Sequence, residues 1–412
     1  MTKKSLLEKQ RLLNLNSALA VIIQRRLAYI FAICLLITPV FGQGKFTISH
    51  GPYLQGLHDT GVTIVWTTEL PSIGWVELAP DDSTHFYYTE RPKFFASSHG
   101  FKNISTLHKV TLKGLKPGTK YRYRVYSQEV TKHVGADVTY GRVAATRVYR
   151  QRPLSFTTSD PQQKEVVFGV INDIHGRNEV MEKLLGQLDF KKTDLVFFNG
   201  DMANDLRTED QMFTDFMDTG VKVFASETPM YYARGNHETR GQYASPFPEY
   251  FPTPTGQLYY MFRRGPICFV VLDCGEDKPD SDIEYSGIVN MDFYRTEQAE
   301  WLKEALKSPE YQSAPYKVVI CHMPPFGGWH GEMEIARKFV PLLNEAGAQI
   351  MISGHLHRYM KVAPTPNNHK FPVLVNSNSH LLRANADQNR LLIEVVDQQG
   401  KVTDTLEIKP QP

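Results

Sequence analysis

Five short polar clusters, each placed after an apolar, β-branched run, carry the residues of this chain that could do chemistry. They supply two aspartates, one asparagine and five histidines, which are hard or borderline metal ligands. Such a set can hold two divalent ions side by side, and a two-metal site is suited to the hydrolysis of phosphate esters. The clusters are Asp173-Ile174-His175, Gly200-Asp201, Gly235-Asn236-His237-Glu238, His322 and Gly354-His355-Leu356-His357.

Each cluster stands where a strand of a layered α/β fold would end. The preceding apolar runs lack polar alternation, which is typical of strands buried on both faces. In such folds ligands gather beyond the carboxyl ends of the strands, so residues far apart in sequence are expected to share one cleft. The expected strands are 166–171, 195–198, 268–272, 318–320 and 350–353, the expected helices are 179–188, 297–306 and 332–346, and a closing hairpin is expected at 391–396 and 402–408.

Residues 45–158 show a different pattern, in which short alternating runs are separated by turns. Alternation with period two and turn signals about every ten residues predict a β-sandwich. The stretch from Leu115 to Tyr121 resembles the tyrosine corner of fibronectin type III domains, with Tyr121 closing the turn. We expect the aromatic residues of this domain to pack in its core or on its sheets rather than to bind a ligand. A polar linker at 158–164 leads to an α/β domain at 165–408.

Residues 1–42 have the pattern of an export signal. A basic region ends at Arg25-Arg26, an apolar stretch covers 27–41, and Val40-Phe41-Gly42 is the expected cleavage site. The apolar stretch is too short for an obvious membrane span. We therefore expect a signal peptide at 1–42 and an exported chain, periplasmic or secreted, with no stable membrane span after cleavage. The alternative is an uncleaved N-terminal anchor helix.

The charge and the cysteines exclude two further classes. The chain carries a formal charge of +2, but residues 1–42 hold six basic residues against one acidic, so the remainder is net negative. No basic field therefore indicates a nucleic-acid partner. Cys268, Cys274 and Cys321 lie in apolar runs, which predicts buried thiols rather than a disulfide framework.

In this order the clusters resemble those of the calcineurin-like metallophosphoesterase superfamily, from about Val166 to Ile408. With the preceding sandwich, the chain is similar to the purple-acid-phosphatase-like branch, whose members carry a fibronectin-like N-terminal domain. The resemblance implies a four-layer α/β/β/α catalytic domain. It implies that His237 is catalytic, beside the scissile phosphate, and that Glu238 orients its neighbours. The implied metal ligands are Asp173, His175 and His357 for one ion, Asn236, His322 and His355 for the other, and Asp201 between them.

Two positions depart from the pattern of true purple acid phosphatases. Those enzymes carry a tyrosine three residues after the bridging aspartate and a glycine where His175 stands, whereas this chain has Asn204 and His175. Exchanging a tyrosinate for an imidazole removes one negative charge from the site. We therefore expect two divalent ions (manganese, iron or zinc) and no charge-transfer colour.

Residues and resemblance together predict hydrolysis of a small-molecule phosphate monoester by a metal-bridging hydroxide. One alternative is a phosphodiesterase or nucleotidase that uses the same metals, and another is a non-catalytic binding protein on the same fold. His330 follows a Gly/Pro-rich loop and is expected to be a substrate contact or a solvated loop residue. The segment 242–256 is a substrate-shaping insertion or an inert surface loop. The sequence does not specify an oligomeric state.

Overall fold

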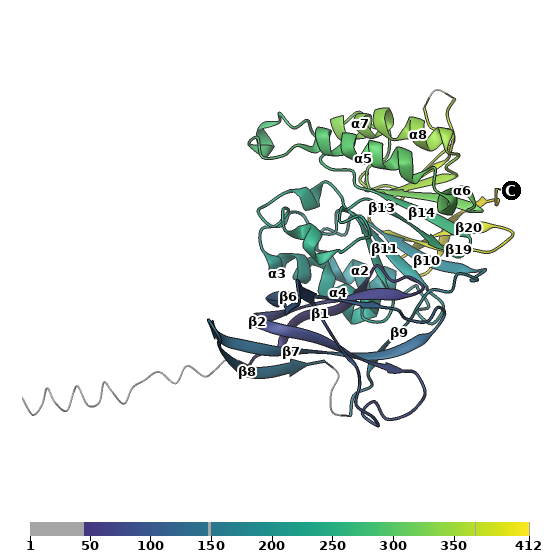
Figure 1. Ribbon diagram of the computed structural model, residues 1–412. Coiled ribbons are helices and arrows are strands. Elements are labelled where there is room, and N and C mark those ends of the chain that lie inside the picture. Colours follow the sequence, from purple (N-terminus) through teal and green to yellow (C-terminus); the bar gives the residue numbers. More distant parts are fainter. Residues whose placement is uncertain (1–44, 147–149, 367, 412) are drawn as a thin grey trace, which may run out of the picture. The chain divides into compact units, whose positions relative to one another are not determined.

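The computed structural model of the protein describes residues 45–146, 150–366 and 368–411. The expected signal peptide at 1–42 lies outside these residues. Within them, every helix is too short or too polar to cross a membrane. Phe46–Pro412 form one compact unit, which contains an antiparallel β domain followed by a layered α/β domain (Figure 1).

The N-terminal domain is built around the long strand β2 (Gly61–Pro80). Its first half pairs with β1 and β6, a register shift follows Thr67, and its second half pairs with β3 and β7. One strand therefore serves both layers, which enclose a common apolar core. The other strands are β1 (Ile48–Gln55), β3 (Lys93–Phe95), β4 (Ser97–Ser98), β5 (Phe101–Lys102), β6 (Ile104–Lys113), β7 (Lys120–Val134), β8 (Asp137–Ala145) and β9 (Leu154–Thr157).

The tyrosine corner is present. The hydroxyl of Tyr121 accepts a hydrogen bond of 2.9 Å from the backbone N–H of Lys116. Its ring lies 5.8 Å from the ring of Phe156 on β9. The contact ties the turn before β7 to the strand that closes the domain.

Two mixed sheets make up the α/β domain. The first has the order β12-β11-β10-β19-β20-β21 and the second β13-β14-β15-β16-β18-β17. Strands β10, β11 and β12 are parallel, as are β14, β15, β16 and β18. The bounds are β10 (Val166–Ile171), β11 (Leu195–Asn199), β12 (Met230–Ala233), β13 (Tyr260–Arg264), β14 (Ile267–Leu272), β15 (Tyr316–Cys321), β16 (Ile350–Ser353), β17 (Met360–Val362), β18 (Val373–Val375), β19 (His380–Ala386), β20 (Leu391–Asp397) and β21 (Val402–Ile408).

The two sheets pack face to face with helices on both outer sides (Figure 1). One apolar cluster joins the inner faces of the sheets, a second lies under the helices of the first sheet, and a third lies under those of the second. The expected four-layer α/β/β/α architecture is thereby confirmed. The helices are α2 (Asn178–Leu185), α3 (Glu209–Met212) and α4 (Asp218–Gly220) on one side, and α5 (Met291–Ala305), α6 (Pro309–Gln312), α7 (His330–Lys338) and α8 (Val340–Glu345) on the other.

The single helix expected at 332–346 is wrong. The chain forms α7 and α8, which meet at Phe339, and Pro341 lies in the first turn of α8. Proline has no N–H and its ring blocks a continuing helix, so the segment begins a new helix there. Helix α5 also begins at Met291, earlier than the expected 297.

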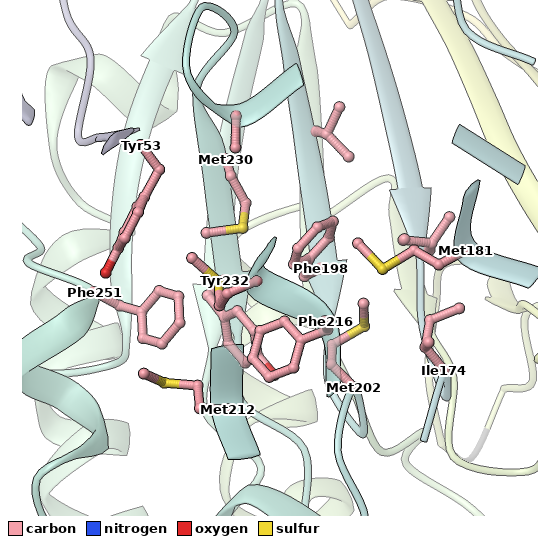
Figure 2. Close-up of a cluster of buried hydrophobic side chains, with 14 of the residues drawn as sticks. Tyr53, Ile174, Met181, Phe198, Met202, Met212, Phe216, Met230, Tyr232 and Phe251 are labelled. Carbon is pink, nitrogen blue, oxygen red and sulfur yellow. The ribbon is translucent and has the colours of Figure 1, made fainter. Parts of the chain in front are cut away.

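The sandwich shares a hydrophobic core with the α/β domain. Tyr53 of β1 and Val65 of β2 belong to the cluster around α2 and β11. Figure 2 shows Tyr53 in the same cluster of buried side chains as Phe251 and Met230. The Tyr53 hydroxyl donates to the carbonyl of Tyr250 at 2.9 Å, within this buried contact. The N-terminal domain is therefore packed against the α/β domain rather than held only by its linker.

His50 of β1 lies in the same contact, and we expect it to make the contact pH-dependent. Its ring stacks on Phe213 at 4.0 Å, Nδ1 lies 3.0 Å from Asp218 and Nε2 lies 3.5 Å from Asp210. Burial lowers the pKa of His50, but the two carboxylates outweigh burial and raise the pKa above its ordinary value of 6.5. The stabilisation is therefore complete below pH 6.5 and is lost as pH rises through the folded-state pKa.

We expect His50→Gln to remove this pH dependence. The difference in free energy of unfolding between wild type and H50Q should be largest at acid pH and shrink as pH rises. Urea unfolding between pH about 5.5 and about 9 measures that difference, and an exposed histidine variant, H133Q, is the control. A difference that stays constant over this range would show that the charge of His50 does not contribute.

Candidate metal centre

The candidate ligands lie at one edge shared by the two sheets. Each follows the carboxyl end of a parallel strand, where ligands gather in α/β folds. Because the sheets pack face to face, loops from both reach the same place. Asp173 and His175 follow β10, Asp201 follows β11, Asn236 follows β12, His322 follows β15, and His355 and His357 follow β16.

Backbone strain is concentrated at these loops. Left-handed conformations of non-glycine residues cost about 1–3 kcal/mol each and cluster at functional sites. At Gly200 (φ 77°) an added Cβ would lie 2.6 Å from both the Gly235 Cα and the His322 ring, so only glycine allows these loops to approach. The candidate ligands with left-handed φ are Asp173 (53°), His175 (50°), Asp201 (53°), His355 (68°) and His357 (53°).

One group of donor atoms converges around Asp173. Ligand atoms of Asp173, His175, Asp201 and His357 lie within 4.8 Å of one another. His357 Nε2 is 3.2 Å from Asp173 Oδ1 and 3.1 Å from His175 Nε2. Asp173 is fully buried, and its Oδ1 accepts no hydrogen bond, whereas its Oδ2 accepts one from the His355 backbone N–H at 3.0 Å. Asp173 Oδ1 is thus left facing the Nε2 atoms of three imidazoles, those of His357, His322 and His175.

A second group converges on the other side of Asp201. Ligand atoms of Asp201, His322 and His355 lie within 4.8 Å of one another. His322 Nε2 is 3.0 Å from Asp201 Oδ2, and His355 Nδ1 is 3.0 Å from Asn236 Oδ1. His322 Nδ1 donates to the Asn199 carbonyl at 2.6 Å, which directs the buried Nε2 into the site. Asp201 belongs to both groups and lies between them.

The electrostatics of the site favour bound cations. Burial lowers the pKa of His322, but the carboxylates of Asp201 and Asp173 outweigh it and raise the pKa to about 10. Burial lowers the pKa of His355 to about 4 and also lowers that of His175, so both imidazoles are neutral, which is the ligand form. Carboxylate, amide and imidazole donors together suit divalent manganese, iron or zinc. The residues therefore fit a pair of divalent ions.

His237 lies beside the candidate ligands without joining either group. Its Nδ1 is 2.7 Å from the Asn204 carbonyl, and because a carbonyl only accepts, Nδ1 carries a proton. Nε2 then faces the site, 3.9 Å from Asp201 Oδ2. The side chain is 26% exposed, so a ligand in the site can reach it.

Glu238 holds two of the ligand loops together. Its carboxylate accepts hydrogen bonds from the backbone N–H groups of Asp201 (2.9 Å), Met202 (2.6 Å), Ala203 (3.3 Å) and Gly235 (3.0 Å). It is fully buried. These contacts fix the position of Asp201 relative to the loop that carries Asn236.

His330 is the first residue of α7, and its Nε2 lies 2.8 Å from Asp292 on α5. This contact engages the imidazole with a neighbouring helix, and a contact with substrate stays a prediction. The segment 242–256 is not an inert surface loop, because Phe247, Tyr250 and Phe251 pack into the apolar core. Its role in shaping the substrate site stays a prediction.

Sequence reasoning missed three residues around the ligands. Glu332 of α7 places Oε1 3.8 Å from His355 Nε2, and Asp277 accepts from Asn236 Nδ2 at 3.4 Å. Arg240 places Nη1 3.5 Å from His237 Nε2. The contacts of Glu332 and Asp277 join segments that are distant in sequence, so no local motif indicates them. Arg240 lies three residues after His237, so its place next to the motif could have been seen in the sequence.

We expect Glu332→Gln to weaken metal binding. The Glu332 Oε1 is buried without a hydrogen bond and faces the ring nitrogen of His355 opposite to the one beside Asn236. Loss of a carboxylate that supports a ligand histidine reduces metal affinity by about 10- to 100-fold. Competition with a chelator measures the effect, and Glu300→Gln on the exposed face of α5 is the control. Equal metal affinity in wild type and E332Q would exclude this support.

Comparison with known families agrees with the fold. Residues 166–359 match the calcineurin-like phosphoesterase family, and residues 52–152 match the N-terminal domain of purple acid phosphatases. The chain therefore contains a calcineurin-like phosphoesterase domain preceded by the N-terminal domain of purple acid phosphatases.

Plant purple acid phosphatases are among its relatives. Purple acid phosphatase 22 of Arabidopsis thaliana is 25% identical over 62% of this chain and 58% of its own length. Probable inactive purple acid phosphatase 27 of the same plant is 23% identical over 66% of this chain and 46% of its own length. The chain thus spans roughly half the length of these curated relatives. The structure of purple acid phosphatase PPD1 from yellow lupin (Lupinus luteus) shares the fold, with a TM-score of 0.63, 16% identity, and coverage of 87% of this chain and 74% of that chain.

Proposed function

We propose that this protein is an exported phosphoric ester hydrolase that cleaves phosphate monoesters with two divalent ions. The observation that carries the proposal is the convergence of two groups of donor atoms that share Asp201. The match to the calcineurin-like phosphoesterase family supports the same reaction class. One ion would be held by Asp173, His175 and His357, the other by Asn236, His322 and His355, and Asp201 would contact both.

When bound, the two ions activate water and neutralise charge on the phosphoryl oxygens. The chain's own residues supply the remaining steps. The Asn204 carbonyl accepts Nδ1–H of His237, so the imidazolium form, which carries a second proton on Nε2, would pass that proton to the leaving oxygen. Glu238 fixes the loops on either side of the reacting group through the four backbone N–H groups from which it accepts hydrogen bonds.

His175 and Asn204, the two residues that depart from the pattern of true purple acid phosphatases, support a pair of divalent ions. His175 contributes a neutral imidazole to the first group, and Asn204 turns its backbone carbonyl to His237. The site thus gains the neutral imidazole of His175, while Asn204 stands where an anionic tyrosinate would balance a ferric ion. Metal-loaded protein should therefore lack an intense visible band.

The export part of the proposal rests on the N-terminal sequence pattern. The mature chain would then contain the two domains at 45–158 and 165–408. The intact mass of the protein recovered from the periplasm or medium tests it. A mass that includes residues 1–42, recovered with the membrane fraction, would favour the anchor alternative.

The ratio of kcat/KM for p-nitrophenyl phosphate and bis-p-nitrophenyl phosphate tests the reaction. It is measured on manganese- or zinc-loaded mature protein, with Asp201→Ala as the blank. A monoester preference supports the proposal. A diester preference moves the protein to the phosphodiesterase class, and no turnover of either ester with full metal content favours the non-catalytic alternative. Two of the curated relatives carry the name probable inactive purple acid phosphatase, which makes this last outcome informative.

A further inference from the structure

Arg240 is held beside the candidate site by hydrogen bonds to Glu276 and Asp277. Its Nε donates to Glu276 Oε1 at 3.0 Å and its Nη2 to Glu276 Oε2 at 3.2 Å, so one edge of the guanidinium forms a two-point pair. Nη2 also donates to Asp277 at 3.3 Å. Arginine is always charged and its planar fork is rigid, so these contacts fix both its position and its direction.

Glu276 is a buried anchor rather than a free carboxylate. It is 0% exposed, and besides Arg240 it accepts from the Thr239 hydroxyl at 2.6 Å and from the Tyr285 hydroxyl at 2.7 Å. The pKa of Glu276 is lowered, because these hydrogen bonds outweigh the effect of burial. Its bonding is satisfied by the surrounding residues, and its charge balances that of Arg240.

The other edge of the guanidinium turns toward the site. Arg240 Nη1 is 3.5 Å from His237 Nε2, at the long limit of a hydrogen bond, so its N–H groups stay available to another acceptor. His237 Nε2 is itself 3.9 Å from Asp201 Oδ2. Arg240 and His237 therefore open onto the same space, next to the residue that both donor groups share. The Arg240 side chain is 21% exposed.

We propose that Arg240 is a substrate-binding residue, which donates from Nη1 to a peripheral oxygen of the phosphoryl group and thereby selects phosphate monoesters. The inference rests on the proposed function and adds a specificity residue to it. A monoester group has three peripheral oxygens and up to two negative charges, whereas a diester has two such oxygens and one charge. One further fixed donor therefore stabilises bound monoesters more.

The effect comes from a directed hydrogen bond and not from a general positive field. Asp277, Glu276 and Glu284 all lie within 4 Å of the guanidinium, so the local acidic groups outnumber the cations Arg240 and Lys278. A general field would survive replacement of arginine by lysine. A directed hydrogen bond would be lost in the lysine variant. A lysine ammonium that pairs with Glu276 lacks the second planar N–H edge with which arginine can reach the substrate.

Two variants test the proposal while keeping the buried charge balanced. Arg240→Lys retains a cation for Glu276, and the double variant R240Q/E276Q replaces the ion pair by a neutral pair of similar shape. Loss of one charge-assisted hydrogen bond should lower kcat/KM for p-nitrophenyl phosphate about 10- to 100-fold. We expect bis-p-nitrophenyl phosphate turnover to change less than about threefold and metal content to stay at the wild-type level. Arg207→Gln, an exposed arginine paired with Asp205, is the matched control.

Calorimetric binding of inorganic phosphate to the metal-loaded protein separates this inference from the proposed function. Weaker phosphate binding by R240K, with R207Q like wild type, supports the role of Arg240 even if neither ester is hydrolysed. Wild-type phosphate binding in both Arg240 variants overturns it. An equal fall for both esters also overturns it, because Arg240 would then only support His237.

Discussion

Asp201→Ala is expected to remove most bound metal and lower kcat/KM for phosphate monoesters by at least about 10³-fold. Asp201 is the residue shared by the two groups of donor atoms, and its side chain is 2% exposed. Its Oδ1 also accepts the backbone N–H of His237 at 3.0 Å, so the carboxylate also positions the loop that carries His237. Elemental analysis of the purified protein and steady-state kinetics measure the two effects.

Asp201→Asn separates loss of charge from loss of shape. The amide keeps the volume of the side chain and can still accept from His237, but it removes the negative charge between the two groups. We expect D201N to lose metal nearly as D201A does, while an exposed aspartate variant, D189N, keeps wild-type metal and rate. Two tightly bound ions in D201A would show that this residue does not contact both.

His237→Gln is expected to reduce kcat by about 10²- to 10⁴-fold with metal content unchanged, because a positioned proton donor is lost. His237 lies outside both groups of donor atoms, and its Nδ1 is tied to the Asn204 carbonyl. The loss should be larger for phenyl phosphate than for p-nitrophenyl phosphate, since the poorer leaving group depends more on protonation. Rates with both esters, measured at equal metal content, check this result.

The comparison of leaving groups distinguishes a proton donor from a structural residue. H133Q, an exposed histidine variant in the sandwich, should match wild type with both esters. If H237Q loses metal together with rate, His237 supports the metal ligands. If it slows both esters by the same factor at full metal content, it binds substrate without passing a proton.

The architecture could be predicted because its signals are local. Buried parallel strands appear as apolar runs without alternation, and polar residues directly after them mark the edge where loops meet. The candidate ligands at the ends of β10 and β15 were found in this way, and the structure brings them together. The hairpin of β20 and β21 was predicted from its alternation and turn and is confirmed.

The missed features depend on contacts between distant segments. Arg240 is positioned by its ion pair with Glu276, and His330 contacts Asp292 on another helix. Neither pairing leaves a pattern in the local sequence. The break at Phe339 was missed for a different reason, because Pro341 is compatible with the start of a helix and the apolar spacing continues across it.

The position of Tyr53 and Val65 has a consequence for how this chain can be altered by recombination. Both side chains lie in the core that forms under α2, so the α/β domain relies on apolar groups encoded in the N-terminal domain. An unrelated β-sandwich therefore cannot replace this domain without loss of core contacts. A different sandwich fused before residue 165 would have to reproduce these side chains and the hydrogen bond to the Tyr250 carbonyl. We therefore expect substitutions at this contact to be coupled between the two domains during evolution.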